Sequence, residues 1–109
     1  MNGRLTTHVL DTATGRPAAG MAITLSRLHP QPGELGRFVT NDDGRADGPL
    51  LEGVALIVGE YELLFHVGDW QPGGFYASVP IRFRVTDPGS HHHVPLILSP
   101  FGYATYRGS

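Results

Sequence analysis

The chain contains no cysteine and no lysine among its 109 residues, and each absence excludes a class of chemistry. Without cysteine there can be no disulfide, no thiolate zinc site and no cysteine nucleophile. All eight positive charges are arginine, and ten acidic residues bring the formal net charge to −2. That balance provides no basic surface for nucleic acid, so we expect no nucleic-acid partner. No apolar run approaches the roughly 20 residues that span a bilayer, so we expect no membrane association.

The composition indicates a folded domain that is rich in turns. Hydrophobic residues make up 40% of the chain and charged residues 17%, which is enough apolar material for a packed core. Fifteen glycines and nine prolines are spread along the chain without a period, which is typical of many turns. A chain of this length predicts a single domain, residues 1–109. Residues 1–4 are too short and polar for a signal peptide, so we expect a cytoplasmic protein.

Alternation of apolar and polar residues predicts short β-strands separated by turns. Residues 78–87 show it most clearly, because every second residue from Val79 to Val85 is apolar. No window of 12 residues has clear helical periodicity, and only residues 50–57 come near one. This pattern predicts an all-β fold, an antiparallel β-sandwich of seven to eight strands with at most one short helix. The expected strands cover residues 4–10, 21–28, 37–40, 50–51, 60–67, 78–87, 91–98 and 103–107.

Histidine is the most conspicuous reactive residue type, and three of the six histidines occur in a row. On a strand, His91 and His93 point to one face, whereas His92 points to the other face with the apolar residues. We therefore expect His92 in the core, with a hydrogen-bond partner. The outward pair has three interpretations: zinc binding with a third ligand from elsewhere, acid–base chemistry on water, or solvated surface histidines. Spacing alone does not choose among them.

Two further candidates, His8 and Arg45, come from other parts of the chain. His8 lies on the polar side of the first expected strand, where a lone histidine is most often a satisfied polar residue. Arg45 follows the tight turn at residues 41–44, which could aim its guanidinium at an oxyanion or a planar ring. A solvated loop arginine is the plainer alternative. The aromatic and hydroxyl-rich segment 103–109 is expected to pack against the domain.

Three segments in these same regions resemble the motifs of one known family. Residues 5–12 (LTTHVLDT) and 15–20 (GRPAAG) resemble the N-terminal signature of the 5-hydroxyisourate hydrolases, transthyretin-related enzymes of urate breakdown. Residues 40–45 (TNDDGR) resemble the second motif, and residues 91–109 (HHHVPLILSPFGYATYRGS) resemble the C-terminal signature, the most specific of the three. Transthyretin itself is similar in fold but lacks the histidine and Tyr-Arg-Gly-Ser pattern, so the resemblance favours the enzymes.

The resemblance implies a transthyretin-like (prealbumin-like) sandwich that assembles as a homotetramer, a dimer of dimers with its active sites in the channel between dimers. The family's catalytic residues correspond to His8, Arg45 and His93. His91, the other member of the His-x-His pair, would support the site from a second layer without contacting substrate. The implied substrate-binding residues are His8, Arg45, Tyr106, Arg107 and Ser109.

The reaction implied by the resemblance is hydrolysis of the lactam ring of 5-hydroxyisourate to 2-oxo-4-hydroxy-4-carboxy-5-ureidoimidazoline. His8 and His93 would activate a water and return its proton to the leaving nitrogen, while Arg45 would stabilise the oxyanion. This chemistry requires no metal and no organic cofactor. The alternative function is a non-catalytic transthyretin-like carrier of a small aromatic ligand in an inter-subunit channel.

Two segments depart from the family's pattern. The middle residue of the His-x-His pair is usually aromatic in the family and is His92 here, which we expect to be neutral and hydrogen-bonded at some cost in stability. Residues 68–75 are shorter than the family's usual helix-bearing connection, which leaves open whether a helix forms there. No residue that the resemblance assigns to the chemistry lies in that segment.

Overall fold

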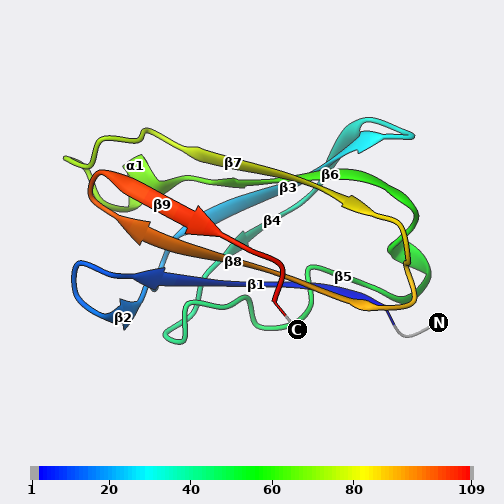
Figure 1. Cartoon of the computed structure of the whole chain (residues 1–109), viewed down its shortest axis with the longest axis horizontal. Helices are drawn as coiled ribbons and strands as arrows, with labels where there is room; N and C mark the ends of the chain where they lie inside the picture. Colours follow the sequence, from blue (N-terminus) through cyan, green and yellow to red (C-terminus); the bar gives the residue numbers. More distant parts are fainter. Residues whose placement is uncertain (1–2, 109) are drawn as a thin grey trace.

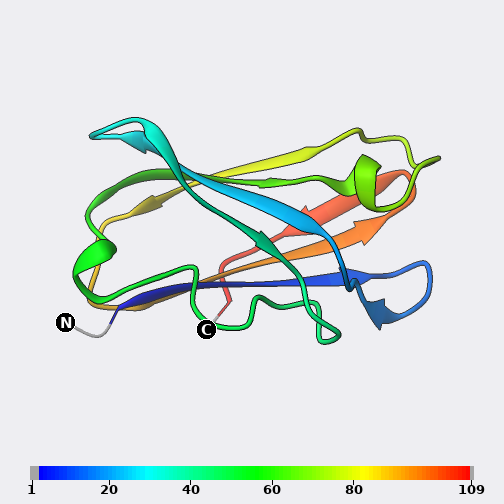
Figure 2. The same cartoon turned by 180° about the vertical axis from the view of Figure 1, so that it is seen from behind.

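Two β-sheets pack face to face in the computed structural model, which describes residues 3–108 (Figure 1). One sheet has the strand order β2-β1-β8-β9 with β5 paired to β1, and the other has the order β4-β3-β6-β7. The view from behind shows the same two layers (Figure 2). The strands are β1 (Arg4–Asp11), β2 (Arg16–Pro17), β3 (Ala22–His29), β4 (Gly33–Val39), β5 (Leu51–Glu52), β6 (Gly59–Phe65), β7 (Val79–Val85), β8 (His91–Ser99) and β9 (Gly102–Thr105).

The core forms between the sheets because alternate residues of the long strands point inward. In β1 every second residue from Leu5 is buried, and β6 buries Tyr61, Leu63 and Phe65 in the same way. The Tyr61 hydroxyl donates to the carbonyl oxygen of Ile57 at 2.8 Å, so this large side chain is buried with its polar atom satisfied. Each large apolar side chain buried here contributes roughly 1.5–3 kcal/mol. The intervening polar side chains remain on the two outer faces, where a site can form.

The expected β-sandwich is confirmed, and two of its nine strands within residues 3–108 are only two residues long. Residues 50–57, which came nearest to a helical pattern, contain β5 and a single 3-10 turn, η1 (Gly53–Ala55). The shortened connection after β6 keeps one turn of helix, α1 (Val67–Trp70), and the Trp70 indole N–H donates to the Ala19 carbonyl at 2.7 Å. None of the helices in residues 3–108 is long and apolar enough to cross a membrane.

One strand pair departs from the expected antiparallel arrangement, because β1 and β8 run parallel. Parallel neighbours need a long crossover connection, and here all four strands of the second sheet lie between them in the sequence. The register places Arg4 opposite His91 and Thr6 opposite His93. Two segments from opposite ends of the chain therefore lie side by side and share one outer face.

Candidate active site

The three consecutive histidines of β8 divide between the two faces of the first sheet. His92 is 4% exposed and lies in the core, where its Nδ1 is 3.0 Å from the Ser90 carbonyl oxygen. His91 and His93 are half-buried on the outer face, with ring centroids 6.0 Å apart. Strand alternation predicted this division, and Ser90 provides the hydrogen-bond partner that a buried histidine requires.

The neighbouring strand β1 adds polar side chains to the same outer face. His8 lies opposite Pro95, two residues along the register from the pair formed by Thr6 and His93. The Thr6 hydroxyl oxygen lies 2.6 Å from Nε2 of His91 and 2.8 Å from Nδ1 of His93. Thr6 was not among the residues predicted for the site, because threonine is common in strands. The available signal was its place two residues before His8, which puts both on one face.

The turn before Arg45 holds this residue at the same face. The side-chain oxygen of Asn41 accepts hydrogen bonds from the backbone N–H of Asp43 at 2.9 Å and from that of Arg45 at 3.2 Å. Gly44 has a φ of 74°, and a Cβ there would collide with the carbonyl oxygen of Val9 in β1. Only glycine allows both the positive φ and the close approach. The turn is therefore fixed against β1, and Arg45 follows it directly.

These side chains border an open pocket of about 480 Å³ on the outer face of the first sheet. The volume lies in the range of small-molecule sites. His8 stands beside the pocket on β1 rather than in its lining. A second cavity, of about 190 Å³, lies at the α1 end of the sandwich and contains none of the predicted site residues. The polar residues that line the larger pocket include Arg4, Thr6, Arg45, Asp47, His91 and His93.

The surroundings of the site histidines favour their neutral forms. Partial burial and then the Arg45 guanidinium lower the pKa of His8, while Asp43 opposes this shift. Partial burial also lowers the pKa of His93, with further contributions from Arg45, His91 and His8. A neutral imidazole can take a proton from water at neutral pH, as a general base must.

The C-terminal segment after β9 continues alongside β8, because Gly108 forms an antiparallel bridge with His93. The backbone N–H of Gly108 donates to the carbonyl oxygen of His93 at 2.8 Å, and a Cβ on Gly108 would come within 2.5 Å of the His93 ring. The Arg107 guanidinium donates to the Ser90 hydroxyl and to the His91 carbonyl oxygen, both at 3.3 Å. This segment therefore packs closely against the strand that carries the histidines.

The pocket gathers only part of the predicted site. His91, which was expected to support the site from a second layer, lines the pocket itself. Arg107 is engaged with β8, and Tyr106 is 58% exposed and does not line the pocket. Ser109 lies outside the described residues, 3–108. Within those residues, no group of three or more histidine, aspartate or glutamate side chains is placed to hold a metal ion.

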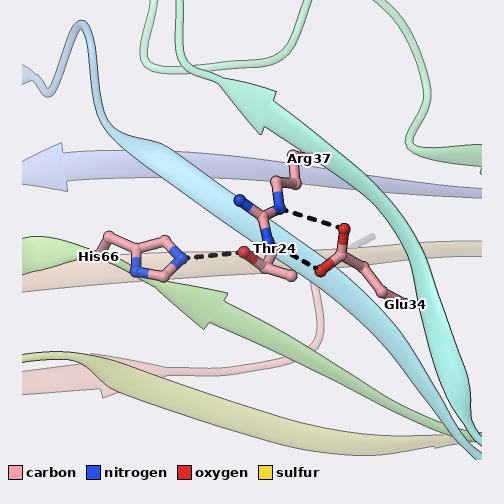
Figure 3. A network of polar contacts seen from close by, with 4 residues as sticks. All are labelled: Thr24, Glu34, Arg37 and His66. Atoms are coloured by element: carbon pink, nitrogen blue, oxygen red, sulfur yellow. Dashed lines mark hydrogen bonds and ion pairs between the residues drawn. The ribbon is translucent and has the colours of Figure 1, made fainter.

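A separate polar network lies on the outer face of the second sheet (Figure 3). The Thr24 hydroxyl oxygen lies 2.9 Å from Nε2 of His66, and the Arg37 guanidinium forms an ion pair with Glu34 at 3.1 Å. Like the pocket on the first sheet, this face has a threonine in contact with a histidine and an arginine nearby. They provide matched controls for substitutions in the site.

Known proteins match this chain over almost its whole length. The model of the HIUase/Transthyretin family matches residues 5–108. The 5-hydroxyisourate hydrolase 2 of Rhizobium meliloti (strain 1021) is 55% identical over 117 residues, which cover 99% of this chain and 98% of that protein.

Solved structures share both the sequence similarity and the fold. The crystal structure of (S)-allantoin synthase is 45% identical with a TM-score of 0.94, and the match covers 99% of this chain but 44% of that chain. The 5-hydroxyisourate hydrolase of Klebsiella pneumoniae is 34% identical with a TM-score of 0.85, and the match covers 98% of this chain and 99% of that one. The matches include both β1, which carries His8, and β8, which carries the two histidines of the pocket, and the chain belongs to the HIUase/Transthyretin family.

Proposed function

We infer that this chain is a 5-hydroxyisourate hydrolase, an enzyme of urate breakdown that opens the lactam ring of its substrate. One observation carries the inference. His93 and Arg45 border a single pocket with His8 alongside, in a chain that is 55% identical to a 5-hydroxyisourate hydrolase of Rhizobium meliloti. A carrier of an aromatic ligand needs mainly apolar walls, whereas two arginines and two histidines line this pocket. The lining therefore favours the enzyme over the carrier.

The proposed role of His8 and His93 is to activate the attacking water. The lowered pKa values of both side chains leave them neutral at neutral pH, so a ring nitrogen can take a proton from water as it attacks the lactam carbonyl carbon. The C–N bond of the lactam then breaks, and the leaving nitrogen receives that proton. The product of this hydrolysis is 2-oxo-4-hydroxy-4-carboxy-5-ureidoimidazoline.

The proposed role of Arg45 is to bind the substrate's carbonyl oxygens and to stabilise the oxyanion. Its guanidinium is permanently charged and carries several N–H donors in a planar fork. Loss of one oxyanion donor typically lowers kcat by about 10²–10³-fold. Tyr106, Arg107 and Ser109 are proposed to complete the substrate-binding surface. The mechanism uses only groups of the protein and assigns no role to a metal or organic cofactor.

The working form is proposed to be a cytoplasmic homotetramer, a dimer of dimers whose channel contains the pocket. The pocket is open on an outer sheet face, which another copy of the chain can cover. Strands β7 and β9 end their sheets and leave backbone groups available for pairing between chains. Phe101 and Tyr103, at the β9 edge, are exposed aromatic side chains of the kind that subunit contacts bury.

The proposal is tested by generating 5-hydroxyisourate in situ from urate with a urate oxidase and following its near-ultraviolet absorbance. We expect the protein to accelerate the decay with and without a chelator. Arg45→Ala should lower kcat by about 10²–10³-fold, because the oxyanion loses its donor. Arg37→Ala, which removes an exposed arginine from the opposite sheet (Figure 3), should retain wild-type activity.

Two results would contradict the proposed function or its mechanism. Decay no faster than the blank, in protein that is folded and assembled, would leave the ligand carrier as the better explanation. Equal activity in Arg45→Ala and Arg37→Ala would remove Arg45 from the mechanism.

A further inference from the structure

The Thr6 hydroxyl bridges two histidine rings at the pocket. Its oxygen lies 2.6 Å from Nε2 of His91 and 2.8 Å from Nδ1 of His93, and both distances are within the range of good hydrogen bonds. The parallel register of β1 and β8 creates the bridge, because it sets Thr6 directly opposite His93. The resemblance to the hydrolases assigned no role to Thr6, and the mechanism above does not use it.

A hydroxyl has one proton and two lone pairs, so Thr6 can donate to only one of the two rings, and while it donates to one ring it accepts from the other. When His93 donates its Nδ1 proton to Thr6, Thr6 donates to Nε2 of His91, and Nε2 of His93 carries a free lone pair. In the opposite arrangement His91 donates to Thr6, Thr6 donates to Nδ1 of His93, and the proton of His93 is on Nε2. The bridge therefore couples the tautomers of the two rings.

We propose that Thr6 is a positioning residue for the hydrolysis, which holds His93 with its Nε2 free as a base and links that ring to His91. This inference rests on the proposed function, since it assigns the water-activating step to His93. It also gives His91, which lines the pocket, a role that requires no contact with substrate.

The proton movements balance over one turnover. As water attacks, its proton goes to Nε2 of His93. The Nδ1 proton of His93 then passes to the Thr6 oxygen while the Thr6 proton passes to Nε2 of His91, so the positive charge moves from His93 to His91. When the C–N bond breaks, the leaving nitrogen takes the Nε2 proton of His93, and the two bridge protons return. Both rings are then neutral again.

The charges around the bridge favour the return of that proton. Partial burial and then Arg4 lower the pKa of His91, and Arg107 contributes in the same direction. The acidic side chain in the pocket lining, Asp47, accepts a hydrogen bond from the Asn41 amide at 3.1 Å. A proton on His91 is therefore held weakly and returns readily through Thr6 to the His93 ring, while the Nε2 proton of His93 goes to the leaving nitrogen.

Two variants of Thr6 and one control variant distinguish the effect of the hydroxyl group from the effect of the side-chain shape. Thr6→Val removes the hydroxyl and keeps the branched shape, whereas Thr6→Ser keeps the hydroxyl and can restore the bridge. The matched control is Thr24→Val, since Thr24 makes the same type of contact with His66 on the opposite sheet (Figure 3). All three are compared by steady-state kinetics on 5-hydroxyisourate and by thermal unfolding.

We expect Thr6→Val to lower kcat roughly 10- to 100-fold with a change in KM below about threefold, because the base loses its orientation but the pocket keeps its shape. Thr6→Ser should retain at least about a third of the wild-type kcat, and Thr24→Val should match the wild type. Equal activity of Thr6→Val and Thr24→Val would overturn the proposal. A Thr6→Ser variant that is folded but as slow as Thr6→Val would overturn it as well.

The tautomer of His93 provides a test that does not depend on turnover. Nitrogen-15 NMR of histidine-labelled wild-type protein should show His93 protonated on Nδ1 and unprotonated on Nε2 at neutral pH. Thr6→Val should lose this preference, and Thr24→Val should keep it. Wild-type His93 with its proton on Nε2 would overturn the inference even in an active enzyme. The expected tautomer in a protein that does not hydrolyse 5-hydroxyisourate would instead overturn the proposed function.

Discussion

At the scale of single residues, Arg45 has two effects on the site. It is the proposed oxyanion donor, and its charge contributes to the lowered pKa values of His8 and His93. A base with a lowered pKa stays unprotonated further into the acid range. Activity should therefore be complete above the ordinary histidine pKa of 6.5 and should fall only as the pH drops through the lowered values.

Arg45→Gln tests this coupling directly. Removal of the positive charge should raise the pKa of both His8 and His93, because the protonated rings lose a repulsive neighbour. An NMR pH titration of the ring C–H signals measures both values, whether or not the variant is active. Arg37→Gln, on the opposite sheet, should leave them unchanged. Unchanged values in Arg45→Gln would show that the Arg45 charge does not contribute to the shifts.

At this scale the sequence predicted the strand faces on which the candidate histidines of β8 lie, but not the contacts between residues. The two-residue period of a strand is enough to assign His92 to the core and His93 to an outer face. It does not reveal which strand lies alongside, so the contact of Thr6 with His93 could not be predicted. The resemblance likewise identified Arg107 but not its hydrogen bond to the His91 carbonyl.

At the scale of elements, the turn before Arg45 connects local conformation to the position of a site residue. Gly44 has a φ of 74° and lies where a Cβ would collide with the Val9 carbonyl. Gly15 provides a matched comparison, since its φ is 75° and nothing lies within 4 Å of its Cβ position. Both glycines have a positive φ, which disfavours any residue with a side chain. Only at Gly44 would a Cβ also collide with a neighbouring atom.

Gly44→Ala should therefore destabilise the fold more than Gly15→Ala does. We expect Gly15→Ala to lower the free energy of unfolding by about 1–2 kcal/mol, from the left-handed backbone alone. Gly44→Ala should lose about 2–5 kcal/mol, because a steric collision adds to that strain. Urea unfolding at one fixed protein concentration measures both. Equal losses of unfolding free energy in the two variants would show that β1 moves to accommodate the added methyl group at no energetic cost.

Gly44→Ala should also lower activity, since the turn that carries Arg45 must move away from β1. Gly15→Ala provides the activity control, because its turn lies beyond the far end of β1. If Gly44→Ala kept the wild-type kcat, the conformation of this turn would not be what positions Arg45 for catalysis.

The sequence predicted where the long strands lie more readily than it predicted which strands pair with each other. The long strands follow from alternation, but β2 and β5 are two residues each and exist only because β1 is there to pair with them. The one-turn helix α1 is too short for a periodic signal, and its Trp70 is bound to the Ala19 carbonyl from a distant part of the chain. The parallel β1–β8 pair depends on the path of the whole chain.

At the scale of the whole molecule, the site assembles from segments that are far apart in sequence. His8 comes from β1, Arg45 from the loop before β5, and His93 from β8. No local folding unit contains all three, so the site forms only when the first sheet closes around its parallel pair. Its outer face remains open in a single chain, which is why we expect assembly to affect activity.

The proposed tetramer predicts a native mass of four times that of one chain, measured by light scattering over a range of concentrations. Ala104→Glu should weaken it. Ala104 is exposed in β9, at the free edge of the first sheet. If two β9 strands pair across a two-fold axis, the new carboxylates come close together, and like charges in such positions repel.

Ala22→Glu is the matched control, because Ala22 is an exposed strand residue on the second sheet and lies away from both free edges. We expect Ala104→Glu to dissociate at concentrations where Ala22→Glu and the wild type remain assembled. Its activity should fall with the fraction dissociated, because the pocket loses the copy that covers it. A wild-type protein that is monomeric and fully active would rule out the channel as part of the site, and the open face of a single chain would then be sufficient for catalysis.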